Sequence, residues 1–115
     1  MENKISYDDF MKVDIRVGKL VDAQEFPEAK VPALKLTIDF GPEIGIKKSS
    51  AQIVGAYKKE ELIGMLVIGV VNFPPKQVGP FISEVLTLGF KNQEGDGFIL
   101  AVPDRNTVEL GDRMR

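Results

Sequence analysis

The side chains that most often carry enzyme chemistry are missing from this sequence. It contains no histidine and no cysteine, so the usual general base at neutral pH and the thiolate nucleophile are both absent. The same absence removes the commonest zinc ligands and any disulfide. Catalysis would depend on carboxylates, lysine amines or the two tyrosines, Tyr7 and Tyr57, and no spacing pairs them as acid and base. We therefore predict a protein that is not an enzyme and that uses no metal or cofactor.

Lysines are the clearest candidates for binding chemistry. Lys47 and Lys48 are adjacent, and Lys76 directly follows two prolines. Lysine and arginine neutralise phosphates, and binding that depends on them weakens steeply as salt is added. Because the formal net charge is −2, the protein as a whole does not attract nucleic acid, and an RNA site must be a local patch. The alternative for these lysines is a solvated surface position.

Two further motifs resemble functional sites but do not meet their requirements. Residues 41–49 contain glycines and lysines, but the lysines are not placed as in a phosphate-binding loop. The acidic pairs Asp8-Asp9 and Glu60-Glu61 are adjacent in sequence, and adjacent residues on a helix point away from each other. We expect helix capping and exposure to solvent for these carboxylates.

The composition is typical of one globular domain. The chain has 115 residues, of which 43% are hydrophobic and 28% charged, and this length suits a single core. No apolar run reaches the roughly 18 to 20 residues that cross a bilayer, and the first residues do not resemble a signal peptide. We expect a single domain over residues 1–115, without membrane insertion, in the cytoplasm.

Local patterns predict a short helix followed by a first strand. Ser6 and Asp9 have the spacing of a capping box, which predicts a helix over about residues 7–12. Residues 14–23 then alternate between apolar and polar, with a change of phase across Gly18. We interpret this change of phase as a β-bulge, because glycine within a strand often marks one.

Short strands make up most of the remaining pattern. We predict that the strands over residues 34–40 and 44–50 form a hairpin and that residues 51–62 contain helical turns. Residues 66–71 are apolar on both faces, which predicts that they form the central buried strand. Strands are expected over residues 34–40, 44–50, 66–71, 81–90 and 98–102. This spacing predicts a mainly all-β protein: a five-stranded barrel of the oligonucleotide-binding (OB) type with short helices and terminal extensions.

Seven ordered segments resemble one protein family. They are Asp14-Ile15-Arg16-Val17-Gly18, Glu25-Phe26-Pro27, Lys35-Leu36, Asp39-Phe40-Gly41, Ser49-Ser50-Ala51-Gln52-Ile53, Asn72-Phe73-Pro74-Pro75 and Ser83-Glu84-Val85-Leu86. Together they resemble the tRNA-binding domain that is appended to some methionyl-tRNA synthetases. The match covers nearly the whole chain, and the likeness is greatest to the branch of that family in which the domain stands alone.

The resemblance implies a set of partners and an RNA-facing surface. It implies tRNA binding, a homodimer built partly from terminal extensions, and a chaperone role in protein export through unfolded preproteins and the translocation motor SecA. In that surface the lysines would neutralise phosphates, Ser49 and Ser83 would donate to phosphate or ribose, and Asn72 would read a base edge or brace its loop. The residues carried over are Lys47, Lys48, Ser49, Ser50, Asn72, Lys76 and Ser83.

Phenylalanines in or beside the loops support a second hypothesis. Phe26, Phe73 and Phe81 would hold extended apolar segments of unfolded protein, or would instead lie in the core or contact a second copy. Many family members carry Ser-x-Gly-Met at residues 83–86, where this chain has Val85 and Leu86, and this departure favours the chaperone branch. The two hypotheses are a tRNA-binding protein with a chaperone role and a chaperone with little or no RNA binding.

Overall fold

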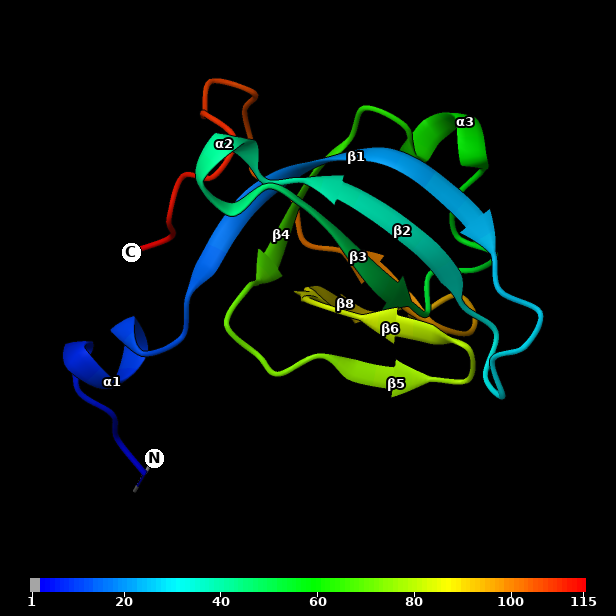
Figure 1. The fold of residues 1–115 in the computed structure, drawn as a ribbon, viewed down its shortest axis with the longest axis horizontal. Helices are drawn as coiled ribbons and strands as arrows, with labels where there is room; N and C mark the ends of the chain where they lie inside the picture. The colour runs from blue at the N-terminus through cyan, green and yellow to red at the C-terminus, as the bar shows by residue number, and fades with distance from the viewer. Residues whose placement is uncertain (1–2) are drawn as a thin grey trace.

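Five antiparallel strands wrap into a nearly closed barrel, so the predicted OB-type architecture is confirmed (Figure 1). The computed structural model describes residues 3–115. The barrel strands, in their order across the sheet, are β3 (Ile46–Ala51), β2 (Leu34–Asp39), β1 (Ile15–Glu25), β4 (Leu66–Val70) and β7 (Leu86–Thr87). Two hairpins pair β5 (Lys76–Val78) with β6 (Phe81–Ser83) and β8 (Gly89–Lys91) with β9 (Phe98–Leu100). The helices are α1 (Tyr7–Met11), α2 (Gly41–Ile44) and α3 (Lys59–Leu62).

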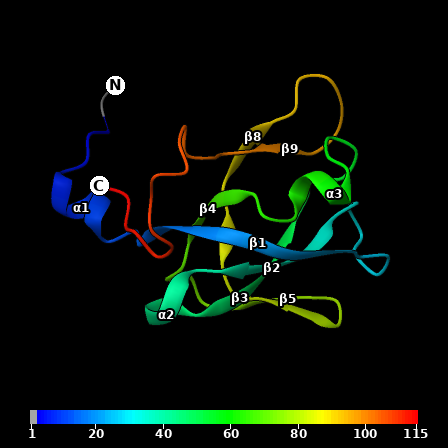
Figure 2. The ribbon, with the colours of Figure 1, turned by 90° about the horizontal axis from the view of Figure 1, so that it is seen from above.

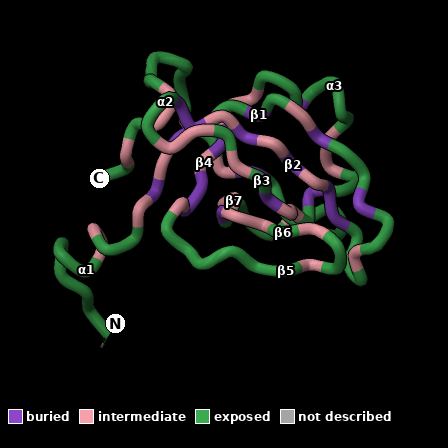
Figure 3. The backbone as a smooth tube through the Cα atoms, in the orientation of Figure 1, coloured by how far each residue is buried: buried purple, intermediate pink, exposed green. Residues whose placement is uncertain are grey.

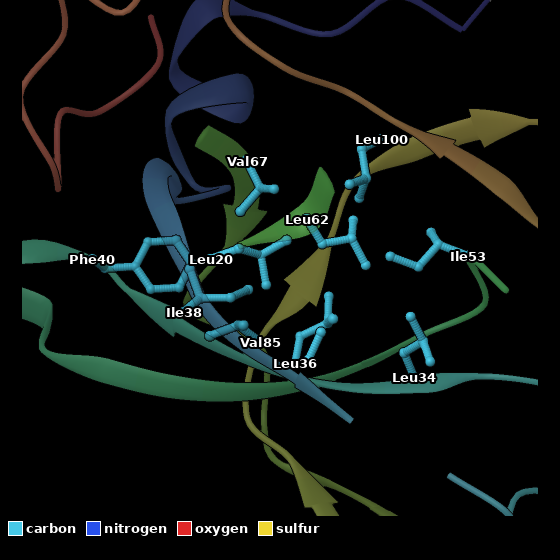
Figure 4. Packing of buried hydrophobic residues seen from close by; sticks show 11 residues of the cluster. Leu20, Leu34, Leu36, Ile38, Phe40, Ile53, Leu62, Val67, Val85 and Leu100 are labelled. Carbon is cyan, nitrogen blue, oxygen red and sulfur yellow. The ribbon is translucent and has the colours of Figure 1, made fainter. Parts of the chain in front are cut away.

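The core fills the inside of the barrel. Leu34, Leu36 and Ile38 alternate with half-buried residues along β2 and are themselves buried, as expected for a strand with one face inward. Buried segments follow β1, β2 and β4 in Figure 3, whereas α1 is exposed or half-buried. Figure 4 shows the side chains of β2 converging with Leu20, Phe40 and other buried residues in the middle of the barrel.

Gly18 has a different role from the bulge that its place in the sequence suggested. The first strand does shift register, as the predicted bulge requires, but the shift lies further along, between Leu20 and Asp22 in the pairing of β1 with β2. A Cβ atom at Gly18 would lie 2.9 Å from the Phe40 ring, and one at Gly69 would lie 3.1 Å from it. The two glycines therefore leave room for the aromatic ring in neighbouring strands β1 and β4.

Three strand predictions differ from the structure. Ile44 belongs to α2, and β3 begins after Gly45, whose φ of 86° turns the chain in a conformation that favours glycine. Residues 81–90 form β6, β7 and β8 in place of one strand, because the chain leaves each pairing after two or three residues. The middle strand of the sheet is β1, and β4 lies beside it.

Side chains, more than backbone pairing, close the barrel between β3 and β7. The Ser49 hydroxyl donates to the carbonyl of Val85 at 3.1 Å and accepts from the Thr87 hydroxyl at 2.8 Å. The Ser83 hydroxyl accepts from the backbone N–H of Ser50 at 3.0 Å. Glu84 reinforces the contact, since its carboxylate accepts from the N–H of Lys48 at 3.0 Å and its own N–H donates to the Lys48 carbonyl at 2.8 Å.

A charged cluster joins the two ends of the chain to the start of β1. Asp14 contacts Arg16 at 2.6 Å and Arg113 at 3.5 Å. Arg16 also donates to the carbonyl of Gly111 at 3.0 Å, and Arg113 donates to the carbonyl of Met11. The hydrogen bond with Asp14 raises the pKa of Arg16 above its ordinary value, so this residue stays charged. Residues 111–114 thus lie along β1, where Figures 1 and 2 place the C-terminal segment.

Helix α1 lies outside the barrel (Figures 1 and 2). The Ser6 hydroxyl accepts from the N–H of Asp9 at 3.0 Å, and the Asp9 carboxylate accepts from the N–H of Ser6 at 3.2 Å. The latter bond lowers the pKa of Asp9. The helix nevertheless buries none of its residues. Among residues 3–115, no helix combines the length and apolar character that crossing a membrane requires.

Candidate nucleic-acid interface

The β5–β6 hairpin forms one wall of a pocket of about 710 Å³. The opposite walls are the loop that joins β1 to β2 and the far end of β3. OB folds bind oligonucleotides with this part of the barrel, between the first loop and the loop that precedes the last strand. The polar residues around the pocket are Glu28, Lys30, Ser50, Gln52, Lys76, Ser83 and Glu84, and its large apolar residues are Val31, Phe73, Pro74, Val78, Val85 and Leu86.

Four of the residues predicted from the sequence meet in this pocket. Lys76 and Ser83 are cross-strand partners in the β5–β6 hairpin, so their Cβ atoms stand close together. Ser50 lies opposite them on β3 and is joined to Ser83 by the hydrogen bond that closes the barrel. Phe73 is 51% exposed, so its ring is available to a ligand.

The two adjacent lysines do not form one patch. Consecutive side chains of a strand point to opposite faces, and Lys47 and Lys48 are consecutive in β3. Lys48 lines a second hollow of about 510 Å³ with Lys35 and Phe81, whereas Lys47 lines neither hollow. The second hollow lies over the outer faces of β1 and β2, on the side of the hairpin away from the larger pocket.

Phe26 and Phe81 form an aromatic pair at the edge of the second hollow. Phe26 is buried, and its ring meets that of Phe81 edge-on with the centroids 5.4 Å apart. The ammonium group of Lys35 lies 5.5 Å from the Phe26 centroid, within the range of a cation–π contact. Phe26 is therefore a core residue, which was the alternative to peptide binding, and the ring of Phe81 packs against it.

Ser49 and Asn72 also make structural contacts. Ser49 has no exposed surface, and its hydroxyl is engaged by Val85 and Thr87, so it is not available to a phosphate in this conformation. The side chain of Asn72 accepts from the N–H of Asp14 at 3.0 Å and donates to the carbonyl of Lys12 at 2.8 Å. These two bonds favour bracing over base reading for Asn72.

Two lysines that line the pocket and the second hollow are not among the RNA-binding residues predicted from the sequence. Lys30 lines the larger pocket and Lys35 the smaller. Lys30 lies in the loop between Pro27 and Pro32, where sequence alone offered no reason to prefer it. Lys35 could have been identified, because it is one of the outward-facing residues of the clearest alternating strand in the chain.

The pocket suits a ligand that presents both a flat apolar group and hydrogen-bonding groups. The Phe73 ring can stack against an unpaired base, and Lys30 and Lys76 can neutralise phosphates. Glu28 and Glu84 balance these two lysines, so the pocket has no large excess of positive charge. Within residues 3–115, no group of three or more carboxylates is arranged to hold a metal ion.

Comparisons with known proteins agree with this architecture. Residues 15–113 match a family model described as "Putative tRNA binding domain". The methionine–tRNA ligase of Nitrosomonas europaea is 38% identical over 100 residues, which cover 87% of this chain but 14% of the ligase. That of Nanoarchaeum equitans is 37% identical over 116 residues, with 96% of this chain and 14% of the ligase covered. The chain thus spans about one seventh of the length of these curated relatives.

Two solved structures are similar over their whole length. A CsaA chaperone protein from Picrophilus torridus has a TM-score of 0.88 and 54% identity, covering 97% of this chain and all of that one. Chaperone CsaA from Bacillus anthracis has a TM-score of 0.88 and 45% identity, covering 98% of this chain and all of that one. CsaA is the stand-alone branch that the sequence resembles. With a family model matched from the first barrel strand to the C-terminal segment, the chain belongs to the putative tRNA-binding domain family.

Proposed function

We propose that this protein is a non-catalytic tRNA-binding protein that also acts as a chaperone of the CsaA type. The observation that carries the proposal is the pocket beside the β5–β6 hairpin, which joins Phe73, Lys76 and Ser83 at the ligand-binding side of an OB barrel. Membership of the tRNA-binding domain family supports RNA as the ligand. The similarity to two CsaA chaperones supports the second activity.

In this proposal the pocket takes an unpaired nucleotide of the tRNA. A base stacked on Phe73 contributes about 1–3 kcal/mol. Lys30 and Lys76 neutralise phosphates on either side. The Ser83 hydroxyl exchanges its 3.3 Å bond to the Val85 carbonyl for a bond to ribose or phosphate. The bases of a tRNA loop are accessible in this way, because they are unstacked, unlike those within a helix.

Charge reversal at the pocket tests RNA binding. We expect Lys30→Glu with Lys76→Glu to lower tRNA affinity at least tenfold in a mobility shift. The slope of log affinity against log salt should become shallower by about 1–2 units, because each phosphate contact contributes about 0.7–0.9 to that slope. The control is Lys59→Glu with Lys91→Glu, which changes the net charge equally at exposed positions outside the pocket. Equal losses in both pairs would assign the effect to overall charge and overturn the site.

The apolar part of the pocket supports the chaperone activity. Val31, Phe73 and Leu86 are 53%, 51% and 46% exposed and lie together around the pocket, and apolar residues that are grouped in this way beside polar ones mark binding sites. We propose that they contact extended apolar segments of unfolded polypeptides. The role in export with SecA that the family resemblance implies, and the cytoplasmic location expected from the sequence, remain predictions.

Phe73 is the residue with which to test that activity. We expect Phe73→Ala to reduce suppression of client aggregation at least twofold, as measured by light scattering at equimolar protein, because the side chain supplies the largest apolar contact in the pocket. Phe90→Ala is the matched control, since Phe90 is 69% exposed on β8, away from the pocket. Should the two variants suppress aggregation equally well, the polypeptide does not bind in this pocket.

A homodimer is part of the same proposal. Helix α1 buries none of its residues, and Ile5 and Tyr7 at its start are 70% and 63% exposed. A second copy that covers this surface would supply the packing that a five-residue helix lacks. Light scattering of the protein without tRNA reports its mass, and a monomer at micromolar concentration would contradict the dimer.

A further inference from the structure

Asn72 connects two parts of the molecule that are far apart in the sequence. Its side chain bonds to the N–H of Asp14 and to the carbonyl of Lys12, 58 and 60 residues away. The backbone contributes one more bond at this point, from the N–H of Val71 to the carbonyl of Asp14 at 2.9 Å. The residues that immediately follow Asn72 are Phe73 and Pro74, which line the pocket.

The loop from residue 72 to residue 75 depends on this connection. Two of its four residues are prolines, which have no N–H to donate. In the described part of the chain, no hydrogen bond besides those of Asn72 holds residues 72–75. The loop is therefore positioned by Asn72 at its start and by β5 at its end. Phe73 directly follows Asn72, so its position depends on the bonds of the Asn72 side chain.

Helix α1 depends on the same side chain from the other direction. A helix of five residues is not stable in isolation, and α1 packs no buried residue against the barrel. Contacts at its C-terminal end attach it: Arg113 donates to the carbonyl of Met11, and Asn72 donates to that of Lys12. The Asn72 side-chain amide therefore contributes both to the attachment of α1 and to the placement of the loop that carries Phe73.

We infer that Asn72 is a positioning residue that couples the folding of α1 to the shape of the pocket. When α1 is formed, Lys12 and Asp14 hold the Asn72 amide and the loop places Phe73 as the pocket wall. When α1 unfolds, the Lys12 carbonyl at its C-terminal end is no longer held in place. The amide then loses its acceptor and keeps only the Asp14 N–H, so the position of the aromatic residue in the pocket is less well fixed. The consequence for ligand affinity rests on the proposed function, whereas the coupling itself does not.

A double-mutant cycle tests the coupling with tRNA as the probe. Ser6→Ala removes the helix cap, which lowers the equilibrium constant for forming α1 about fivefold, and it lies outside the pocket. We expect it to weaken tRNA binding about two- to fivefold in the otherwise unchanged protein and to have no further effect when combined with Asn72→Ala. An additive effect in the double variant would overturn the inference, because independent sites add.

Matched variants separate coupling from loss of an asparagine as such. Asn92 also holds a loop, since its side chain accepts from the N–H of Glu94 at 2.9 Å. In an Asn92→Ala background, Ser6→Ala should keep its full effect. Asn72→Asp keeps the acceptor for the Asp14 N–H but loses the donor to the Lys12 carbonyl, so we expect a smaller coupling than in the unchanged protein. If Asn72→Asp altered base preference and left the cycle unchanged, Asn72 would be a base-reading residue and the inference would fail.

Hydrogen exchange without RNA distinguishes failure of the inference from failure of the proposed function. Ser6→Ala should increase amide exchange in residues 73–78 in the otherwise unchanged protein but not in the Asn72→Ala variant. If exchange in that segment does not respond, the coupling is wrong whatever the tRNA affinity. If exchange responds and tRNA does not bind to the unchanged protein, the coupling stands and the proposed ligand is wrong.

Discussion

Replacing Asp14 with alanine is expected to lower the free energy of unfolding by about 3 kcal/mol, because it leaves two arginines without their shared partner. The side chains of Arg16 and Arg113 are 14% and 34% exposed, and that of Asp14 is 21% exposed. Removing one member of a buried ion pair costs about 3–5 kcal/mol, and the partial exposure of this cluster places it at the lower end. Urea unfolding followed by circular dichroism gives the measurement.

Asp104 provides the matched control for that prediction. It pairs with Arg105 at 2.9 Å, but the two side chains are 90% and 81% exposed. Ion pairs of this kind contribute about 0–1 kcal/mol, so Asp104→Ala should change stability little. A loss at Asp14 no greater than the loss at Asp104 would show that the cluster does not hold the chain ends together.

Phe40→Ala should cost about 3–5 kcal/mol, the range measured for truncating a buried phenylalanine. Phe40 has no exposed surface, and its ring fills the space that Gly18 and Gly69 leave in the adjoining strands. The truncation therefore opens a cavity beside two positions that carry no side chain. Thermal or urea unfolding measures the loss, and the exposed Phe90→Ala variant should stay within about 0.5 kcal/mol of the parent.

A second substitution tests the reason for that loss. Gly18→Ala alone should destabilise the protein by about 1–3 kcal/mol, the usual cost of overpacking, because its Cβ would lie within 3 Å of Ile38 and Phe40. In the Phe40→Ala background that cost should shrink, since one of the two obstructing side chains is gone. A cost that is unchanged in that background would mean that Gly18 does not make room for the ring.

Much of the fold could be predicted because its strands alternate. β2 has one face inward along its whole length, so its pattern in the sequence defines it clearly. The segment after Pro80 was harder, because three short strands pair with three different partners there and a single alternating pattern runs through all of them. The role of Gly18 cannot be predicted, because a glycine that accommodates a ring from another strand looks the same in sequence as one at a bulge.

The site could be predicted only in part, since binding and structural roles use the same residue types. Lys76 and Ser83 were expected together and share a pocket, whereas the adjacent Lys47 and Lys48 are separated by the alternation of the strand. A buried serine such as Ser49 cannot be told from an exposed one without knowing its partners on another strand. Lys30 could not be found, because its loop has no regular pattern that indicates which way a side chain points.

The charged cluster has a consequence for the order in which the chain can fold. The first residues of β1 form their outer hydrogen bonds with residues 111–114, and Arg16 bonds to a carbonyl 95 residues further along the sequence. A ribosome makes the N-terminal part first, so Asp14 and Arg16 cannot meet these C-terminal partners until nearly all of the family domain has emerged. The start of the first strand is therefore among the last parts of the barrel to be completed during synthesis.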